Sequence, residues 1–230
     1  PPLPNLPPPV TIHTVVSHLA SPYSIARWIW ALLIASASAV YLYCLFIGVF
    51  RTADGAVSWS RAQSGIVGRI GFEAPLVMDA DAPDRLWTVD TSGRLFRTLD
   101  GASNWNATGY VVPFGDGFPL QVAFADVPGA ANLGQLYLVA NGAFPVRPEQ
   151  GIYKSTNSGA SFTQLGGAAI PGNQPFASIA VDPSNPLLVL AGTDSYDAEG
   201  GAPSIGLIFR STDGGASWTA VLSQVTTSSS

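Results

Sequence analysis

Short apolar runs alternate with polar turns along most of the chain. Four of these turns share one pattern, in which a hydroxyl residue comes first, a carboxylate or amide comes third and an aromatic residue closes the turn. Each turn follows a strand-like apolar run, as in GVFR, RLFR, GIYK and LIFR. Each turn and the residues on either side of it are therefore predicted to form a strand, a turn and another strand. The four turns are Thr52–Trp59, Thr98–Trp105, Ser155–Phe162 and Ser211–Trp218.

The repeating unit is longer than the turn itself. Three further apolar runs end at Asp79, Asp126 and Asp182, and each is followed by a turn and another apolar run. The third residues of the four shared turns lie 46, 57 and 56 residues apart. Such intervals fit four short strands per unit, which is the composition of a β-propeller blade.

The four turns resemble the Asp-box, or BNR-repeat, pattern Ser/Thr-x-Asp-x-Gly-x-Thr/Ser-Trp/Phe. The resemblance covers residues 48–224 and is complete in the fourth turn. It departs at Ala56 and Ala102 in place of Gly, at Asn104 in place of a hydroxyl residue and at Asn157 in place of Asp. The resemblance implies a β-propeller, similar to photosystem II assembly-factor, sortilin-type, sialidase and xyloglucan-hydrolase propellers.

The third residue of each turn is expected to act as a structural staple. Asp54, Asp100 and Asp213 should accept hydrogen bonds from nearby backbone N–H groups, and Asn157 keeps the acceptor oxygen. Gly215 supplies a left-handed conformation. At Ala56 and Ala102 this conformation would cost about 1 kcal/mol each.

The aromatic residues that close the turns should pack between adjacent blades. They are Trp59, Trp105, Phe162 and Trp218. In the resembling family the turns lie at the propeller periphery, away from the functional face. None of the turn residues is therefore nominated as catalytic.

Residues 27–47 are predicted to form a transmembrane helix. The stretch from Trp28 to Phe46 holds nineteen residues without a charge, enough for about 28 Å of helix. Trp28 and Trp30 at one end, with Tyr41 and Tyr43 near the other, suit the two membrane interfaces. The alternative is that VYLYCLF is a strand of the first blade, because its aromatic and β-branched content suits either structure.

The chain ends have compositions of their own. Residues 1–26 begin with the proline-dense stretch PPLPNLPPPV, which predicts either an extended arm along a partner or a disordered terminus. Residues 225–230 form a polar tail. Arginines flank the apolar stretch on both sides and do not fix its orientation. Family precedent places the propeller on the periplasmic or extracellular side.

Blade counting leaves closure of the propeller open. If a helix fills residues 27–47, the first unit keeps only the hairpin of residues 48–62, and three fuller units follow at residues 72–109, 120–166 and 176–222. About four blades of this kind would form an incomplete or barely closed propeller. Exposed sheet edges then predict another polypeptide as a partner or a missing portion.

Composition narrows the chemistry. Charged residues make up 11% of the chain and the net charge is −5, which argues against nucleic-acid binding. A single cysteine and two histidines give no basis for a metal site or a cofactor. An acidic cluster is formed by Asp79, Asp81 and Asp84. We interpret it as a plain turn, and a calcium site is the alternative.

Enzymatic motifs are not evident. A sialidase would need three substrate-binding arginines and a Tyr–Glu pair, and a glycosidase would need paired carboxylates. Asp116 and Asp194 are available, but their spacing does not select them. The sequence therefore predicts a non-catalytic, membrane-anchored propeller that scaffolds a larger membrane protein complex, photosynthetic or respiratory in kind. The alternative is a glycoside hydrolase or sialidase-like fragment.

Overall fold

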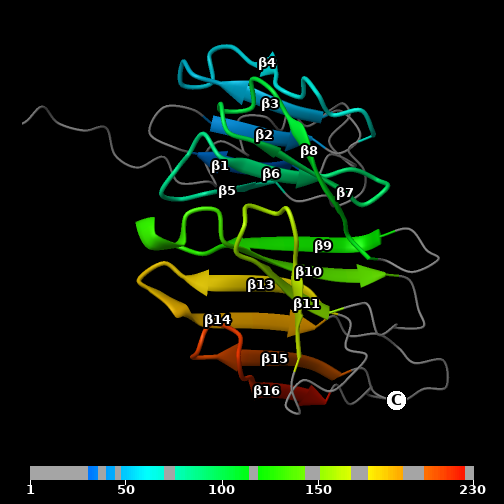
Figure 1. The fold of residues 1–230 in the computed structure, drawn as a ribbon, viewed down its shortest axis with the longest axis vertical. Coiled ribbons are helices and arrows are strands. Elements are labelled where there is room, and N and C mark those ends of the chain that lie inside the picture. Colours follow the sequence, from blue (N-terminus) through cyan, green and yellow to red (C-terminus); the bar gives the residue numbers. More distant parts are fainter. Residues whose placement is uncertain are drawn as a thin grey trace, which may run out of the picture.

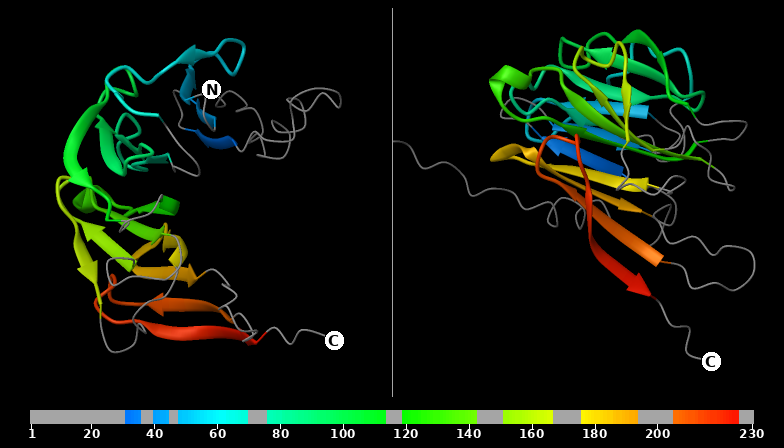
Figure 2. Two further views of the ribbon diagram at one scale, coloured as in Figure 1. Left: turned by 90° about the vertical axis from the view of Figure 1, so that its right-hand side faces the viewer. Right: turned by 60° about the horizontal axis from the view of Figure 1, so that its bottom comes forward.

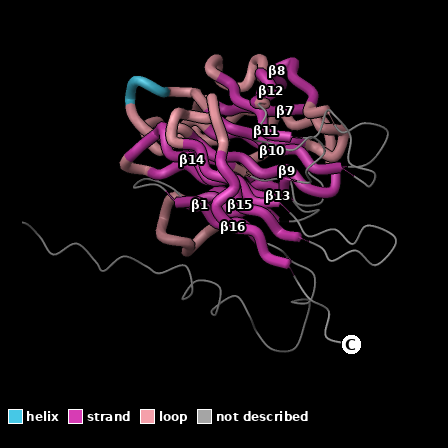
Figure 3. The backbone as a smooth tube through the Cα atoms, turned by 90° about the horizontal axis from the view of Figure 1, so that it is seen from below, coloured by secondary structure: helices cyan, strands magenta, loops and turns pink. Residues whose placement is uncertain are grey.

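A computed structural model describes residues 31–35, 40–44, 48–69, 76–113, 119–142, 151–166, 176–193 and 205–225. Within these ranges the chain forms sixteen strands and one short 3-10 helix, η1, at Ala130–Asn132, the cyan segment in Figure 3. The strands form four sheets of four. The all-β prediction is confirmed.

Each sheet is one blade, built from four consecutive strands. The first blade contains β1 (Ala31–Ala35), β2 (Val40–Cys44), β3 (Gly48–Thr52) and β4 (Ser60–Arg61). The second contains β5 (Val77–Met78), β6 (Leu86–Val89), β7 (Arg94–Thr98) and β8 (Asn106–Val111). The third contains β9 (Pro119–Asp126), β10 (Leu136–Gly142), β11 (Gly151–Ser155) and β12 (Thr163–Leu165). The fourth contains β13 (Phe176–Asp182), β14 (Asn185–Thr193), β15 (Ile205–Ser211) and β16 (Thr219–Val225).

All four blades have the same antiparallel order, with each strand paired to the next in sequence. The blades follow one another along an arc, with the first and fourth at its two ends (Figures 1 and 2). The first strands of the last three blades meet, since β9 contacts both β5 and β13. Four-stranded meanders in this arrangement are the blades of a β-propeller.

The predicted transmembrane helix is wrong for the described residues of that segment. Residues 31–35 and 40–44 form β1 and β2, and β2 pairs along its whole length with β3. Without these strands, the backbone of β3 would lack hydrogen-bond partners on one side. Among the described residues, no helix is long and apolar enough to cross a bilayer.

The first blade is also more complete than the helix prediction allowed. β1 and β2 supply the two strands that were expected to be missing, so the blade is a full four-stranded sheet. Among the described residues, strands of the propeller are therefore present from Ala31, upstream of the predicted boundary at residue 48. Trp28 and Trp30 lie outside the described residues, whereas Tyr41 and Tyr43 lie within β2.

The hydrophobic core lies in the seams, by which we mean the interfaces between successive blades. One cluster joins the first three blades and a second joins the third and fourth. Every residue of β6 is buried, as are Leu136–Ala140 of β10, because these strands have a neighbouring blade on each face. In contrast, Leu190 in the middle of β14 is exposed between the buried Val189 and Ala191, as expected where one face of a sheet is uncovered.

Candidate functional site

Each of the four repeated turns, hereafter the first to fourth box, links the third and fourth strands of its blade. A buried hydroxyl opens every box. The side-chain oxygen of Thr98, which is fully buried, accepts a hydrogen bond from the backbone N–H of Ala102 at 3.1 Å. The same oxygen donates to Asp100 Oδ1 at 2.7 Å. Thr52, Ser155 and Ser211 make the equivalent pair of bonds in the other boxes.

The third residue closes the opposite side of the turn. Asp54 Oδ1 accepts from the backbone N–H of Ser58 at 3.0 Å, and the Ser58 hydroxyl donates to Asp54 Oδ2. In the second box, Asn104 Nδ2 donates to Asp100 Oδ2 at 2.9 Å. In the third box the direction reverses, since Asn157 Nδ2 donates to Ser161 Oγ at 2.8 Å. With Asn104 or Asn157 in the turn, a donor therefore still faces an acceptor.

These hydrogen bonds keep the box carboxylates ionised. Side-chain and backbone donors on Ser58, with the Thr52 hydroxyl, lower the pKa of Asp54 to about 2. Donors on Asn104 and Ser217 lower the pKa of Asp100 and Asp213 in the same way, also to about 2. A carboxylate with such a pKa is a poor proton donor near neutral pH. The arrangement fits a structural staple.

Two consecutive residues of every box adopt the left-handed conformation. At the positions without glycine, φ is 70° for Ala56 and 65° for Ala102. The third box has φ of 60° at Ser158 and 81° at Gly159. A Cβ on Gly159 would lie 2.8 Å from Leu95 Cδ2 of the second blade. A side chain at Gly159 would therefore displace Leu95 of the neighbouring blade.

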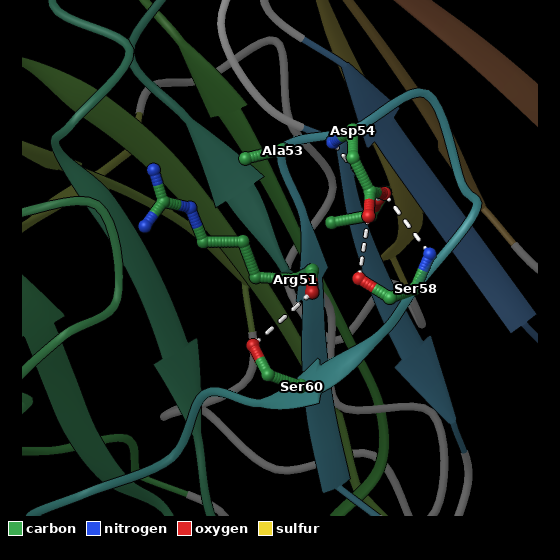
Figure 4. A pocket seen from close by; sticks show the side chains of 6 residues that line it. Arg51, Ala53, Asp54, Ser58 and Ser60 are labelled. Atoms are coloured by element: carbon green, nitrogen blue, oxygen red, sulfur yellow. Dashed lines mark hydrogen bonds between the residues drawn. The ribbon is translucent and has the colours of Figure 1, made fainter.

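The first box borders a shallow hollow on the surface, lined by Arg51, Thr52, Ala53, Asp54, Ser58 and Ser60. Figure 4 shows the Asp54 carboxylate turned toward Ser58, while the Arg51 side chain extends in another direction. Arg51 also lines a second hollow, together with Gly101, Ala102 and Ser103 of the second box. This arginine therefore lies between the first and second blades.

In the second and third blades, a pair of donors reaches the box of the next blade. Trp87 and Arg97 face each other across β6 and β7. Trp87 Nε1 and Arg97 Nη1 each donate to the carbonyl oxygen of Ser158, both at 3.1 Å. Ser158 is the fourth residue of the third box, so these bonds tie the second blade to the third.

The next seam repeats the arrangement. Tyr137 and Lys154 face each other across β10 and β11. Tyr137 donates its hydroxyl to the carbonyl oxygen of Gly214 at 2.7 Å, and Lys154 Nζ lies 3.3 Å from the same oxygen. Burial raises the pKa of Tyr137 to about 12 and lowers that of Lys154. Gly214 is the fourth residue of the fourth box.

Three of the four closing aromatic residues lie in these seams. Trp105 Nε1 donates to the carbonyl oxygen of Ala62 in the first blade at 2.8 Å. The ring of Phe162 lies 4.5 Å from that of Tyr110 in the second blade. Trp218 is buried in the cluster that joins the third and fourth blades. Trp59, at the end of the arc, is half-buried.

Carboxylates of the second and third blades bind backbone N–H groups of the other blade. Asp79 Oδ2 accepts from Gly134 N at 3.1 Å and pairs with Arg85. Asp81 Oδ2 accepts from Gly129 N at 2.6 Å, and Asp126 Oδ2 accepts from Ala80 N at 3.0 Å. In the part of the chain that the structure describes, no three metal-ligating side chains are grouped to hold an ion.

Sequence reasoning missed two features of the seams. One is the basic residue just before the box, as in Arg97 and Lys154, which in the sequence is only the end of an apolar run. A recurring basic residue next to the box was the available signal. Trp87 and Tyr137 carried no comparable signal, because only strand register shows that they face these cations. The enzymatic candidates Asp116 and Asp194 lie outside the described residues.

Comparison with known proteins supports the fold. No protein-family model and no curated protein matches the chain. Among solved structures, an ancestral GH74 enzyme matches with a TM-score of 0.59 and 17% identity over 85% of this chain and 26% of its own. The GH74 enzyme of Niastella koreensis gives 0.58 and 21%, over 80% and 28%. The GH74 xyloglucanase of Xanthomonas campestris gives 0.54 and 18%, over 80% and 28%.

These likenesses concern architecture. The chain spans between a quarter and a third of the length of the three enzymes. At such identities they support the propeller fold that the four blades define.

Proposed function

We propose that this chain is a non-catalytic β-propeller module that scaffolds or stabilises a larger membrane protein complex, as an accessory or assembly subunit of photosynthetic or respiratory type. The box carboxylates support the non-catalytic part of the proposal. Asp54, Asp100 and Asp213 are each committed to hydrogen bonds inside their own turns.

The observation that carries the proposal is the uncovered face of the fourth blade. We call it the open face and define it by Leu190, Ile208 and Arg210. Strand register places these three residues on one side of the sheet, since Leu190 pairs with Arg210, and Gly192 pairs with Ile208. Leu190 is 43% exposed and Ile208 is 36% exposed.

The same position is covered in the two preceding blades. Trp87 and Tyr137, the counterparts of Leu190, are both fully buried. An apolar sheet face of this kind gains stability when another protein surface covers it. Protein binding is therefore the function that best fits the described surface.

Membrane location is a separate part of the proposal. The sequence predicts it from the uncharged run at residues 28–46. Within that run, β1 and β2 are strands of the first blade and not parts of a helix. The prediction of a single-pass anchor helix is not retained. Association with a membrane complex stays a prediction, because a partner subunit could provide the membrane segment.

The test is mild-detergent extraction of native membranes, followed by size separation and mass spectrometry. We expect the chain to migrate in a large complex of fixed stoichiometry. A Leu190→Asp, Ile208→Asp double variant should leave that complex. Leu99→Asp is the matched control, because Leu99 is 58% exposed at the second position of an internal box.

Two results would contradict the proposal. One is migration of the unmodified chain alone, at its mass of 23.9 kDa. The other is hydrolysis of xyloglucan oligosaccharides by the purified chain, which would favour the glycoside hydrolase alternative.

A further inference from the structure

The first box differs from the other three in its exposure. Gly55 and Ala56, its two left-handed residues, are both exposed. The corresponding pairs in the second and fourth boxes are buried, and in the third box Gly159 is buried and Ser158 half-buried. The hydrogen bonds inside the four turns are equivalent, so the turn itself is not the cause. The first box is exposed because no described blade precedes it.

At the fourth blade, the donor side of a seam is present but no described box lies opposite it. Arg210 occupies the position of Arg97 and Lys154, immediately before the hydroxyl that opens the box. Those two residues donate to the box of the next blade. Arg210 is exposed, and it donates to no box carbonyl among the described residues. Its neighbour Leu190 is exposed as well.

The two ends of the arc are therefore complementary. One end presents a cation beside apolar residues, and the other presents an uncovered box with the fourth-position carbonyl of Gly55. Each internal seam of the last three blades joins a cation of this kind to the box of the next blade, at a donor distance of 3.1 Å from Arg97 and 3.3 Å from Lys154. An aromatic donor accompanies the cation in those seams, and Leu190 takes its place in the fourth blade.

We infer that the open face binds the first box of a second copy of this chain, with Arg210 directed at the carbonyl oxygen of Gly55. The contact continues the seam geometry that already joins the blades. The inference rests on the proposed function, because it names a partner for the open face.

Two copies joined in this way are expected to form a closed ring that adds no further copies. An end-to-start contact is heterologous, and such contacts form a closed ring when the rotation between copies returns to the start. Two arcs of four blades give eight blades, which lies within the typical range of about four to eight for propellers. Both ends of both copies are then covered, through two identical contacts.

The first measurement is the mass of the purified full chain by light scattering during size separation. We expect twice the chain mass of 23.9 kDa at micromolar concentrations. A monomer, or an assembly larger than two chains, overturns the inference. A monomer that still comigrates with a native complex would leave the proposed function standing, so the two failures are distinguishable.

Two variants test the two ends separately. Arg210→Glu removes the donor, and we expect the dissociation constant of the pair to rise by at least about tenfold, as for loss of a charged hydrogen bond. Ala56→Asn fills the space that the partner blade needs, while asparagine tolerates the left-handed conformation. Each variant should keep the unfolding midpoint of the monomer close to that of the unmodified chain.

Matched controls lie beside each variant. Thr212→Glu and Val57→Asn alter box positions that stay exposed at the internal seams, at Thr156 and Ser103 for example. Both control variants should pair as the unmodified chain does. Equal weakening by a control and its matched variant would overturn the inference.

A mixing experiment separates head-to-tail pairing from other interfaces. The Arg210→Glu chain retains an intact first box, and the Ala56→Asn chain retains an intact open face. Mixed together, they should form pairs through the one remaining contact, although each alone is monomeric. Failure to pair on mixing, or pairing of either variant alone with the affinity of the unmodified chain, overturns the inference.

Discussion

The Tyr137 hydroxyl lies 2.7 Å from the carbonyl oxygen of Gly214 and donates a hydrogen bond to it. This bond joins a sheet face of the third blade to the box of the fourth blade. Lys154 reaches the same oxygen, and its Nζ lies 5.0 Å from the centre of the Tyr137 ring. Three groups from two blades thus meet at one point. Trp87, Arg97 and Ser158 form the same arrangement one seam earlier.

Tyr137→Phe should therefore destabilise the chain by about 1 kcal/mol, the net value of a typical hydrogen bond. Lys154→Met removes the second donor. Because both donors share one acceptor, their effects should not add, and the double variant should reveal a coupling of about 0.5 kcal/mol or more. Urea unfolding of the four proteins measures this. Strict additivity would show that the two donors act independently.

The buried hydroxyl of the box should matter more than the sequence pattern suggests. Thr98→Val keeps the shape of the side chain but removes the acceptor of the Ala102 N–H and one of the donors to the Asp100 carboxylate. We expect a loss of about 1–3 kcal/mol in the free energy of unfolding. Thr98→Ser, which retains the hydroxyl, should lose less than half as much. Equal losses would assign the effect to packing.

Ala56→Gly should stabilise the chain. Ala56 has φ of 70° and is exposed, so glycine relieves the left-handed strain without removing a buried methyl group. The expected gain is about 0.5–1 kcal/mol. Ala53→Gly, three residues earlier and outside the left-handed pair, should instead destabilise slightly. Thermal unfolding of both variants measures these changes. Destabilisation by Ala56→Gly would contradict the claim that Ala56 is strained.

Stability should depend on pH in two opposite steps. Burial raises the pKa of Asp126 to about 6 from 3.8, and the carboxylates of Asp79 and Asp81 add to this, while the Ala80 N–H acts in the other direction. The folded chain then holds this proton more tightly than the unfolded chain does. Stability should rise as the pH falls from above 6 toward 4.

Below pH 4 the box carboxylates reverse the trend. Their pKa values of about 2 lie below the ordinary 3.8, so their contribution is lost as the pH falls from about 4 to 2. Unfolding midpoints measured from pH 7.5 to 2.5 should peak between pH 4 and 6. Asp126→Asn should abolish the upper step and leave the lower one. An unchanged upper step in that variant would assign it to another group.

Local repetition made the boxes and the blade architecture predictable. The spacing of Asp54, Asp100, Asn157 and Asp213 was enough to indicate four-stranded units. The sequence-based prediction failed at residues 31–35 and 40–44, where an uncharged apolar run suits both a membrane helix and two strands. The pairing of β2 with β3 is a tertiary relation that periodicity does not contain.

The seam donors and the open face were harder to foresee for the same reason. Arg97, Lys154 and Arg210 look alike in sequence, and only the arc shows that the first two have a following blade. Exposure of Leu190 likewise depends on what packs beside the fourth blade. Sequence alone predicted that closure was uncertain and that a partner was needed, but it did not indicate where the partner would bind.

If the open face binds protein, it is covered in the native assembly. Hydrogen exchange should be measured for the monomeric Ala56→Asn chain, whose open face is intact and uncovered, and for the unmodified chain in its native complex. We predict slower exchange in the complex for peptides that span β14 and β15, with the second box at Thr98–Trp105 unchanged. Equal exchange of β14 and β15 in the two samples would contradict the claim that this face binds protein.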